Sequence, residues 1–235
     1  MRLRLLPIFV CMQKTQKNSK QRKLRAQKIV AYLKKTYPAP KSELVYTTPM
    51  QFLVAVMLSA QCTDKAVNKV TQTLWKKYRT PGDFATAKQG VLQKELSSLP
   101  FFRNKAKAII GTARLIEEKH GGRVPSAEAE LVALPGIGYK TAHVILGELY
   151  GAWEGIATDT HVKRFAKRFD LTDEEDLKRI SKDLEMLIPK KDWQYVNNGF
   201  VLYGRYVCPA RPHPCNDHPL TKLWPRATAR WPQAS

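Results

Sequence analysis

The sequence predicts an all-α fold, and two of its patterns carry that prediction. Apolar residues recur three and four positions apart along most of the 235 residues, which is the spacing of a helix with one buried face. Sustained alternation of apolar and polar residues, the pattern of a half-buried strand, does not occur. Hydrophobic residues make up 43% of the chain, enough to bury a core, so a disordered chain is excluded.

The predicted helices are separated by residues that break helices. The first covers 23–37 and ends at Pro38, because proline cannot continue a helix. The second, at 50–59, is apolar on nearly every side and is therefore expected to lie in the core. Thr172 followed by Glu175 is typical of a capping box, which predicts a helix from 173. The other expected helices cover 63–78, a segment beginning near 83, 90–98, 104–119, 126–134, 139–150, 160–169, 173–188 and 191–204.

The two ends of the chain differ from this helical body. Residues 1–42 hold twelve Lys or Arg and no acidic residue, and we expect 1–20 to form a basic, disordered arm. The longest apolar run, 5–12, is much shorter than the roughly 20 residues that cross a bilayer, so no transmembrane helix is expected. Six prolines within 208–235 predict a C-terminal loop and tail instead of a long helix.

The chain as a whole is strongly basic. Forty Lys and Arg against twenty Asp and Glu leave a net charge of +20, a balance typical of proteins that bind a polyanion. Nucleic acid is the leading candidate partner, a membrane surface is second, and solubility alone is the remaining explanation. Four cysteines are too few for a disulfide scaffold, and the N-terminus lacks a signal-peptide cleavage site. We therefore expect a cytoplasmic protein that is associated with the nucleoid and not secreted.

The strongest local motif is Leu-Pro-Gly-Ile-Gly-Tyr-Lys-Thr-Ala at 134–142. Its two glycines, Gly136 and Gly138, allow a tight turn and a close approach of the backbone to another molecule. The helix that follows would present backbone N–H groups to an anion, and for a basic protein the natural anion is a nucleic-acid phosphate. The motif therefore predicts a helix-hairpin-helix element that contacts the phosphate backbone. An ordinary glycine-rich turn is the alternative.

Two ionisable residues stand close to this motif in the sequence. Lys140 is in the first turn of the second helix, and a neutral lysine amine is a nucleophile that can form a Schiff base. Asp159 stands just before the helix expected at 160–169. Judged separately, Lys140 is most simply a phosphate contact and Asp159 a helix cap, so the residue types alone leave both roles open.

Four strings together resemble a known family. They are LPGIGYKTA (134–142), IATDTHV (156–162), LSAQCTD (58–64) and YGRYVC (203–208). Over roughly 21–224 the chain resembles the helix-hairpin-helix DNA glycosylases of base-excision repair, and among them the endonuclease III family. The resemblance implies a two-lobed fold in which a six-helix lobe is inserted between the N-terminal helix and the C-terminal helices. The implied parts are the inserted lobe at 43–155 with its hairpin near 126–150, a second lobe of 21–42 plus 156–207, and the loop and tail at 208–235.

The resemblance also implies a function. It makes Lys140 the nucleophile and Asp159 the essential carboxylate of a bifunctional DNA glycosylase and abasic-site lyase, which excises oxidised pyrimidines and nicks the strand by β-elimination. The implied partner is double-stranded DNA with a damaged or abasic nucleotide. The protein is expected to be a monomer and to bind no membrane. A mismatch thymine or uracil glycosylase and a non-catalytic DNA-binding protein are the alternatives. The implied DNA contacts are Gln61, Phe101, Gly136, Ile137, Gly138, Thr141 and His161.

The chain departs from the family in its C-terminal loop. The family's Cys-x6-Cys-x2-Cys-x5-Cys pattern holds a [4Fe–4S] cluster. Here Cys208 and Cys215 match, but His218 stands at the third position and Trp224 at the fourth. We therefore expect the cluster to be lost, no cofactor or metal to be bound, and Trp224 to pack in the vacated volume. A zinc or degraded iron site that uses these residues with His213, and a cluster completed by an outside ligand, are the alternatives.

Overall fold

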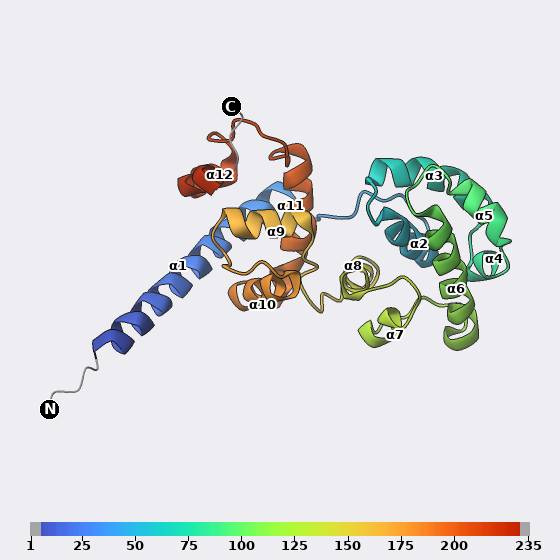
Figure 1. The fold of residues 1–235 in the computed structure, drawn as a ribbon, viewed down its shortest axis with the longest axis horizontal. Coiled ribbons are helices and arrows are strands. Elements are labelled where there is room, and N and C mark those ends of the chain that lie inside the picture. The colour runs from blue at the N-terminus through green and yellow to red at the C-terminus, as the bar shows by residue number, and fades with distance from the viewer. Residues whose placement is uncertain (1–5, 231–235) are drawn as a thin grey trace. The chain divides into compact units, whose positions relative to one another are not determined.

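The fold is entirely helical in the part of the chain that the structure describes. This structure is a computed structural model that describes the backbone of residues 6–230 and the side chains of residues 19–228. Every regular element within these bounds is a helix, as Figure 1 shows. The predicted all-α class is therefore confirmed.

The helices belong to two compact units of the chain. One unit, Lys41–Ala157, holds α2 (Pro49–Ser59), α3 (Asp64–Lys77), α4 (Pro81–Ala85), α5 (Gln89–Glu95), α6 (Phe102–His120), α7 (Glu128–Val132) and α8 (Tyr139–Tyr150). The other unit joins the chain up to Pro40 to the chain from Thr158 onward. Its elements are α1 (Leu6–Thr36), α9 (Thr160–Arg168), α10 (Leu177–Leu187), the 3-10 turn η1 (Lys190–Asp192), α11 (Trp193–Tyr206), α12 (Pro219–Leu223) and the 3-10 turn η2 (Pro225–Arg230).

Helix α2 is the centre of the unit Lys41–Ala157. It begins where Thr48 accepts a hydrogen bond from the Gln51 amide at 3.2 Å and where Pro49 occupies the first turn, a position that needs no N–H donor. Every residue from Met50 to Leu58 is buried, and α2 packs against α3, α6 and α8. The prediction of a buried central helix is confirmed, and each Leu or Val in it contributes roughly 1.5–3 kcal/mol through burial.

Helix α1 begins much earlier than the sequence predicted. The expected helix started at residue 23, behind a disordered arm at 1–20, whereas α1 runs from Leu6 to Thr36. Pro7 lies in the first turn, where its missing N–H costs nothing, and Lys, Gln and Arg, all good helix formers, dominate residues 13–28. Residues 1–5 of the expected arm lie outside the described residues. The buried side chain of Leu33 belongs to the face of α1 that packs on α11, where it lies against Gly199.

Helix α10 begins later than predicted, because its cap is a different residue. Asp176 accepts hydrogen bonds from the amides of Lys178 and Arg179 through one carboxylate oxygen, both at 3.0 Å, and the helix begins at Leu177. The predicted capping box of Thr172 and Glu175 is therefore wrong. The Glu175 carboxylate is instead paired with Lys163 and Lys167 of α9, at 3.1 Å and 2.7 Å.

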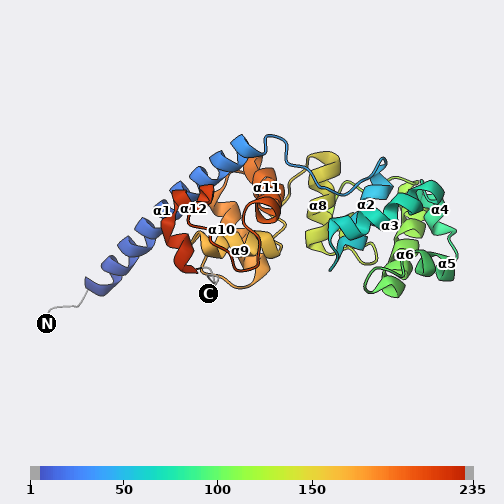
Figure 2. The same ribbon diagram turned by 90° about the horizontal axis from the view of Figure 1, so that it is seen from above.

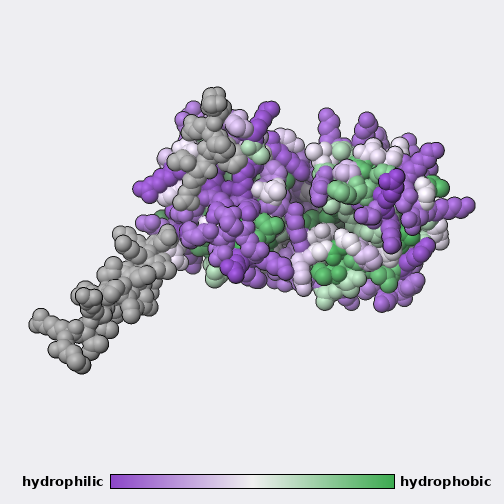
Figure 3. All heavy atoms as spheres, viewed as in Figure 1, coloured by the Kyte–Doolittle hydropathy of each residue, from purple (hydrophilic) through white to green (hydrophobic). Residues whose placement is uncertain are grey.

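The proline-rich C-terminus forms a loop and two short helical turns. As expected, it contains no long helix among the described residues; α12 has five residues, and it lies beside α1, as Figure 2 shows. On the face shown in Figure 3, hydrophilic residues cover most of each unit. No helix in the described part of the chain is both long and apolar enough to span a membrane.

Candidate active site

The glycine motif forms a tight turn between α7 and α8. Gly136 has a φ of +77°, and a Cβ placed there would lie 3.0 Å from the Cβ of Ala108 in α6 and 3.4 Å from Met57 in α2. Glycine is therefore required both for the backbone conformation and for the close packing. Gly138 precedes α8 without a side-chain cap. The side chain of Ile137 is only 5% exposed, so this predicted contact residue could meet a partner only through its backbone.

Two side-chain contacts hold the hairpin in shape. His143 of α8 and Glu128 of α7 approach to 2.5 Å between Nε2 and Oε2, which links the two hairpin helices. The Thr112 hydroxyl of α6 donates to the Pro135 carbonyl at 2.9 Å, which attaches the turn to the rest of the unit. The hairpin is thus held rigidly before any ligand arrives.

Lys140 and Thr141 occupy the first turn of α8. The Lys140 side chain is exposed, and its ammonium has no hydrogen-bond or ion-pair partner among the residues the structure describes. Thr141 is half-buried beside it. A lysine with no partner on the protein, next to a rigid turn, is available to react with or bind an external molecule.

Asp159 caps helix α9. Its Oδ1 accepts a hydrogen bond from the Val162 amide at 2.8 Å, and the side chain is half-buried. The helix-cap role left open by the sequence is therefore present. Asp159 and the nearby His161 belong to the unit with α9, whereas Lys140, Gln61 and the hairpin belong to the unit Lys41–Ala157.

Gly204 makes room for the residues that follow Asp159. A Cβ at this position would lie 2.2 Å from Nδ1 of His161 and 2.5 Å from a guanidinium nitrogen of Arg164. These two nitrogens lie 3.1 Å apart. The string at 203–208 therefore contributes a glycine that lets α11 pack closely on α9.

Gln61 and Phe101 share an unusual backbone conformation. Their φ angles are +57° and +58°, in the left-handed region that favours glycine, which costs of order 1–3 kcal/mol for other residue types. Both side chains are exposed, and Phe101 is 59% exposed despite its apolar ring. Strain of this kind persists where the surrounding structure imposes it. The surroundings of Gln61 and Phe101 therefore hold both backbones in this conformation, in which both side chains are exposed.

Lys105 of α6 supports the strained turn at Gln61 with its side chain, a role that the sequence did not indicate. Its side chain is buried, and its ammonium donates to the carbonyls of Leu58 and Ala60 at 2.9 Å and 2.8 Å, on both sides of the turn before Gln61. Its backbone amide donates to the Phe101 carbonyl at 3.0 Å. Nothing in the helical pattern distinguishes Lys105 from the exposed lysines of α6, because the acceptors come from α2 and the turn that follows it.

Comparison with known proteins identifies the family. Residues 54–190 match the HhH-GPD superfamily base excision DNA repair protein family. Endonuclease III of Synechocystis sp. is 44% identical over 208 residues, which is 88% of this chain and 95% of the relative. The chain belongs to the endonuclease III family. Endonuclease III of Bacillus subtilis is 41% identical over 188 residues, 80% of this chain and 85% of the relative.

Solved structures place the chain in the same family. A trapped endonuclease III–DNA covalent intermediate superposes with a TM-score of 0.82 at 36% identity, covering 88% of this chain and 98% of that one. A thermostable thymine-DNA glycosylase superposes with a TM-score of 0.71 at 20% identity, covering 87% of this chain and 95% of that one, and this second likeness shows a shared fold alone.

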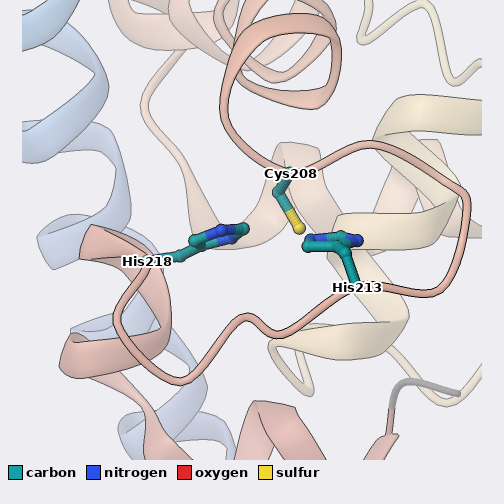
Figure 4. A group of neighbouring side chains, drawn as sticks. All are labelled: Cys208, His213 and His218. Carbon is teal, nitrogen blue, oxygen red and sulfur yellow. The ribbon is translucent and has the colours of Figure 1, made fainter. Parts of the chain in front are cut away.

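The C-terminal loop of this endonuclease III family member gathers a cysteine and two histidines. Donor atoms of Cys208, His213 and His218 all lie within 4.8 Å of one another, and Figure 4 shows both imidazole rings beside the sulfur. Burial lowers the pKa of His218, as do the neighbouring His213 and Arg168. The expectation that no metal would be bound is not confirmed, because this group could hold a metal ion.

The side chain that contacts both remaining family cysteines is Arg168, which the sequence did not single out. This arginine is 1% exposed, and its two terminal nitrogens donate to the sulfurs of Cys208 at 2.6 Å and Cys215 at 2.5 Å. Burial raises the pKa of the Cys208 thiol, and Arg168 opposes that rise. The ring of Trp224 lies 4.0 Å from the guanidinium of Arg25 in α1, and the expectation that this side chain packs in the vacated volume stays a prediction.

Proposed function

We propose that this chain is a bifunctional DNA glycosylase and abasic-site lyase that removes oxidised pyrimidines from double-stranded DNA. The observation that carries the proposal is Lys140: an exposed lysine without a protein partner among the described residues, in the first turn after a rigid glycine hairpin. It stands in a chain that resembles endonuclease III over most of its length, including an endonuclease III trapped as a covalent intermediate with DNA. A protein that only bound DNA would not need this lysine and Asp159 together.

The proposed reaction uses one amine and one carboxylate. The Asp159 carboxylate stabilises positive charge at C1′ of the extruded nucleotide as the bond to the base weakens. The Lys140 amine attacks C1′, so that a carbon–nitrogen bond to the protein replaces the bond to the base, which leaves with a proton. The sugar ring opens to a Schiff base. Loss of a proton from C2′ then expels the 3′ phosphate by β-elimination and nicks the strand.

The proposed DNA contacts come from the hairpin and the two strained residues. Gly136 and Gly138 allow a phosphate to approach the start of α8, where the helix dipole favours an anion, and Thr141 and His161 complete the contacts. Extruding a nucleotide costs a few kcal/mol of stacking. The outward side chains of Gln61 and Phe101 suit the role of occupying the space that the extruded base leaves.

Borohydride trapping tests the function directly. Wild-type protein incubated with duplexes that carry thymine glycol should release the base, nick the strand and, with borohydride, form a covalent protein–DNA complex. Lys140→Ala should lose the covalent complex, while Lys69→Ala, which removes an exposed lysine of α3, should retain it. Duplexes with a thymine or uracil mismatch test the alternative substrate, and an absence of base release on every duplex would leave only DNA binding.

We propose further that the chain does not hold the family's [4Fe–4S] cluster. Two cysteines remain where four are needed, and one buried guanidinium, that of Arg168, donates to both sulfurs. The fourth position is a tryptophan that stacks against Arg25. No step of the proposed reaction passes through a cluster.

A further inference from the structure

The Cys/His group brings together three metal-binding side chains from separate parts of the C-terminal segment. Cys208 follows the end of α11, His213 lies in the loop, and His218 is the residue before α12. Their donor atoms lie within 4.8 Å of one another, with the rings beside the sulfur (Figure 4). We propose that these three residues bind a single zinc ion, at a site independent of the proposed glycosylase chemistry.

The donor set favours zinc over other common ions. One thiolate and two imidazoles are the ligand types that zinc binds in proteins, usually with tetrahedral coordination. Ions such as Mg²⁺ and Ca²⁺ prefer oxygen donors, and none of the three residues offers a side-chain oxygen. Three protein donors leave one position of the tetrahedron for a water molecule.

The histidines carry a feature typical of metal ligands. Nδ1 of His213 lies 2.7 Å from the Arg211 carbonyl, which can only accept, so Nδ1 carries the proton and Nε2 keeps its lone pair. A metal-binding histidine usually donates its other ring N–H to a carbonyl in this way. Nδ1 of His218 is buried and has no hydrogen-bond partner among the described residues. An unsatisfied buried nitrogen is unfavourable, and metal binding to this ring would offset that cost.

Arg168 supplies the charge that a buried thiolate needs. A thiolate is the form of cysteine that binds zinc, and the Arg168 guanidinium donates to Cys208 at 2.6 Å. The guanidinium would stabilise the negative sulfur in this buried place by hydrogen bonding and charge. Arg168 therefore acts on the ligand and not on the metal.

Cys215 distinguishes this site from a remnant of the cluster. It is one of the two cysteines that match the family pattern, and its sulfur also contacts Arg168, yet it is not among the three residues whose donor atoms come together. His213 has no counterpart in the four-cysteine pattern and is among them. The proposed ligand set therefore makes opposite predictions for Cys208 and Cys215.

Metal analysis of four full-length proteins tests the proposal. The wild type, Cys208→Ser, His218→Gln and the control Cys215→Ser are stripped with a chelator and titrated with zinc, and separately with cobalt(II). Wild type and Cys215→Ser should bind an equimolar amount of zinc, gain thermal stability from it, and show a thiolate-to-cobalt absorption band. Cys208→Ser should lose that band, and both ligand variants should lose affinity by more than the roughly 10–100-fold typical of losing an outer hydrogen-bond partner.

Three results would overturn the proposal. They are wild-type protein that takes up no equimolar zinc, a Cys215→Ser protein that loses zinc as Cys208→Ser does, and an iron–sulfur cluster in anaerobically purified protein. Circular dichroism identifies any variant that fails to fold. If both ligand variants unfold, the comparison of wild type with Cys215→Ser still decides. Borohydride trapping by Lys140 is a separate measurement, so failure of the zinc site and failure of the glycosylase proposal are distinguishable.

Discussion

Asp159 shows how one side chain can serve both the fold and the proposed chemistry. Its Oδ1 caps α9, and asparagine caps helices about as well as aspartate. Asp159→Asn should therefore keep its stability and its affinity for DNA while removing the negative charge. Single-turnover base release should fall by about 10²–10³-fold, the usual effect of losing one charge-stabilising group. Base release equal to that of the wild type would mean that Asp159 is only a helix cap.

Lys105 gives a second test at the scale of single residues. Lys105→Met should leave the carbonyls of Leu58 and Ala60 without their donor and lower the free energy of unfolding by about 1–3 kcal/mol. Because the turn at Gln61 loses its support, base release from a paired lesion should slow, whereas release from a lesion in single-stranded DNA should change little. Lys107→Met, on an exposed position of the same helix, is the control. Equal slowing on both substrates would assign Lys105 to general stability.

At the scale of elements, the close approach of α11 to α9 depends on Gly204. Gly204→Ala would place a methyl group 2.2 Å from His161, so the helices must separate or His161 and Arg164 must move. We expect a loss of several kcal/mol in stability, typical of a severe steric conflict in a packed interior, measured by thermal or urea unfolding. Gly90→Ala in α5 meets nothing within 4 Å and should be neutral or slightly stabilising. Similar unfolding midpoints for the two variants would contradict this packing argument.

The elements also show what local sequence can predict. The buried helix α2 and the hairpin turn were predicted correctly, because an apolar run and two glycines act through local backbone and burial preferences. The start of α10 was not, because Asp176 caps the helix and the Glu175 carboxylate pairs with Lys163 and Lys167 of α9. The local pattern does not decide which of the two candidate caps, Thr172 or Asp176, starts the helix.

The roles of two buried cations in the site were also not predicted from the sequence. Lys105 and Arg168 lie in amphipathic helices where most such residues face solvent. Their partners are carbonyls and sulfurs from distant segments, so their roles became visible only with the structure. Lys140 and Asp159, by contrast, were singled out from local motifs. Lys140 follows a glycine turn in the sequence, and Asp159 directly precedes a helix start.

At the scale of the whole molecule, the net charge of +20 predicts salt-dependent binding that is indifferent to sequence. Residues 1–20 hold five basic residues, Arg2, Arg4, Lys14, Lys17 and Lys20. Replacing all five with glutamine, a good helix former, should reduce the salt slope by up to about 0.9 for each phosphate that these residues neutralise in the wild type. The single-turnover rate at saturating DNA should not change. A collapse of that rate would place this segment in the catalytic machinery.

In the proposed reaction, Lys140 forms the covalent bond to the sugar. The most direct measurement is peptide mapping, by mass spectrometry, of the complex trapped by borohydride on thymine glycol DNA. We predict that the reduced sugar fragment is attached to the peptide that contains Lys140, and to no other lysine. An adduct on a different lysine, or on the N-terminal amine, would contradict the claim.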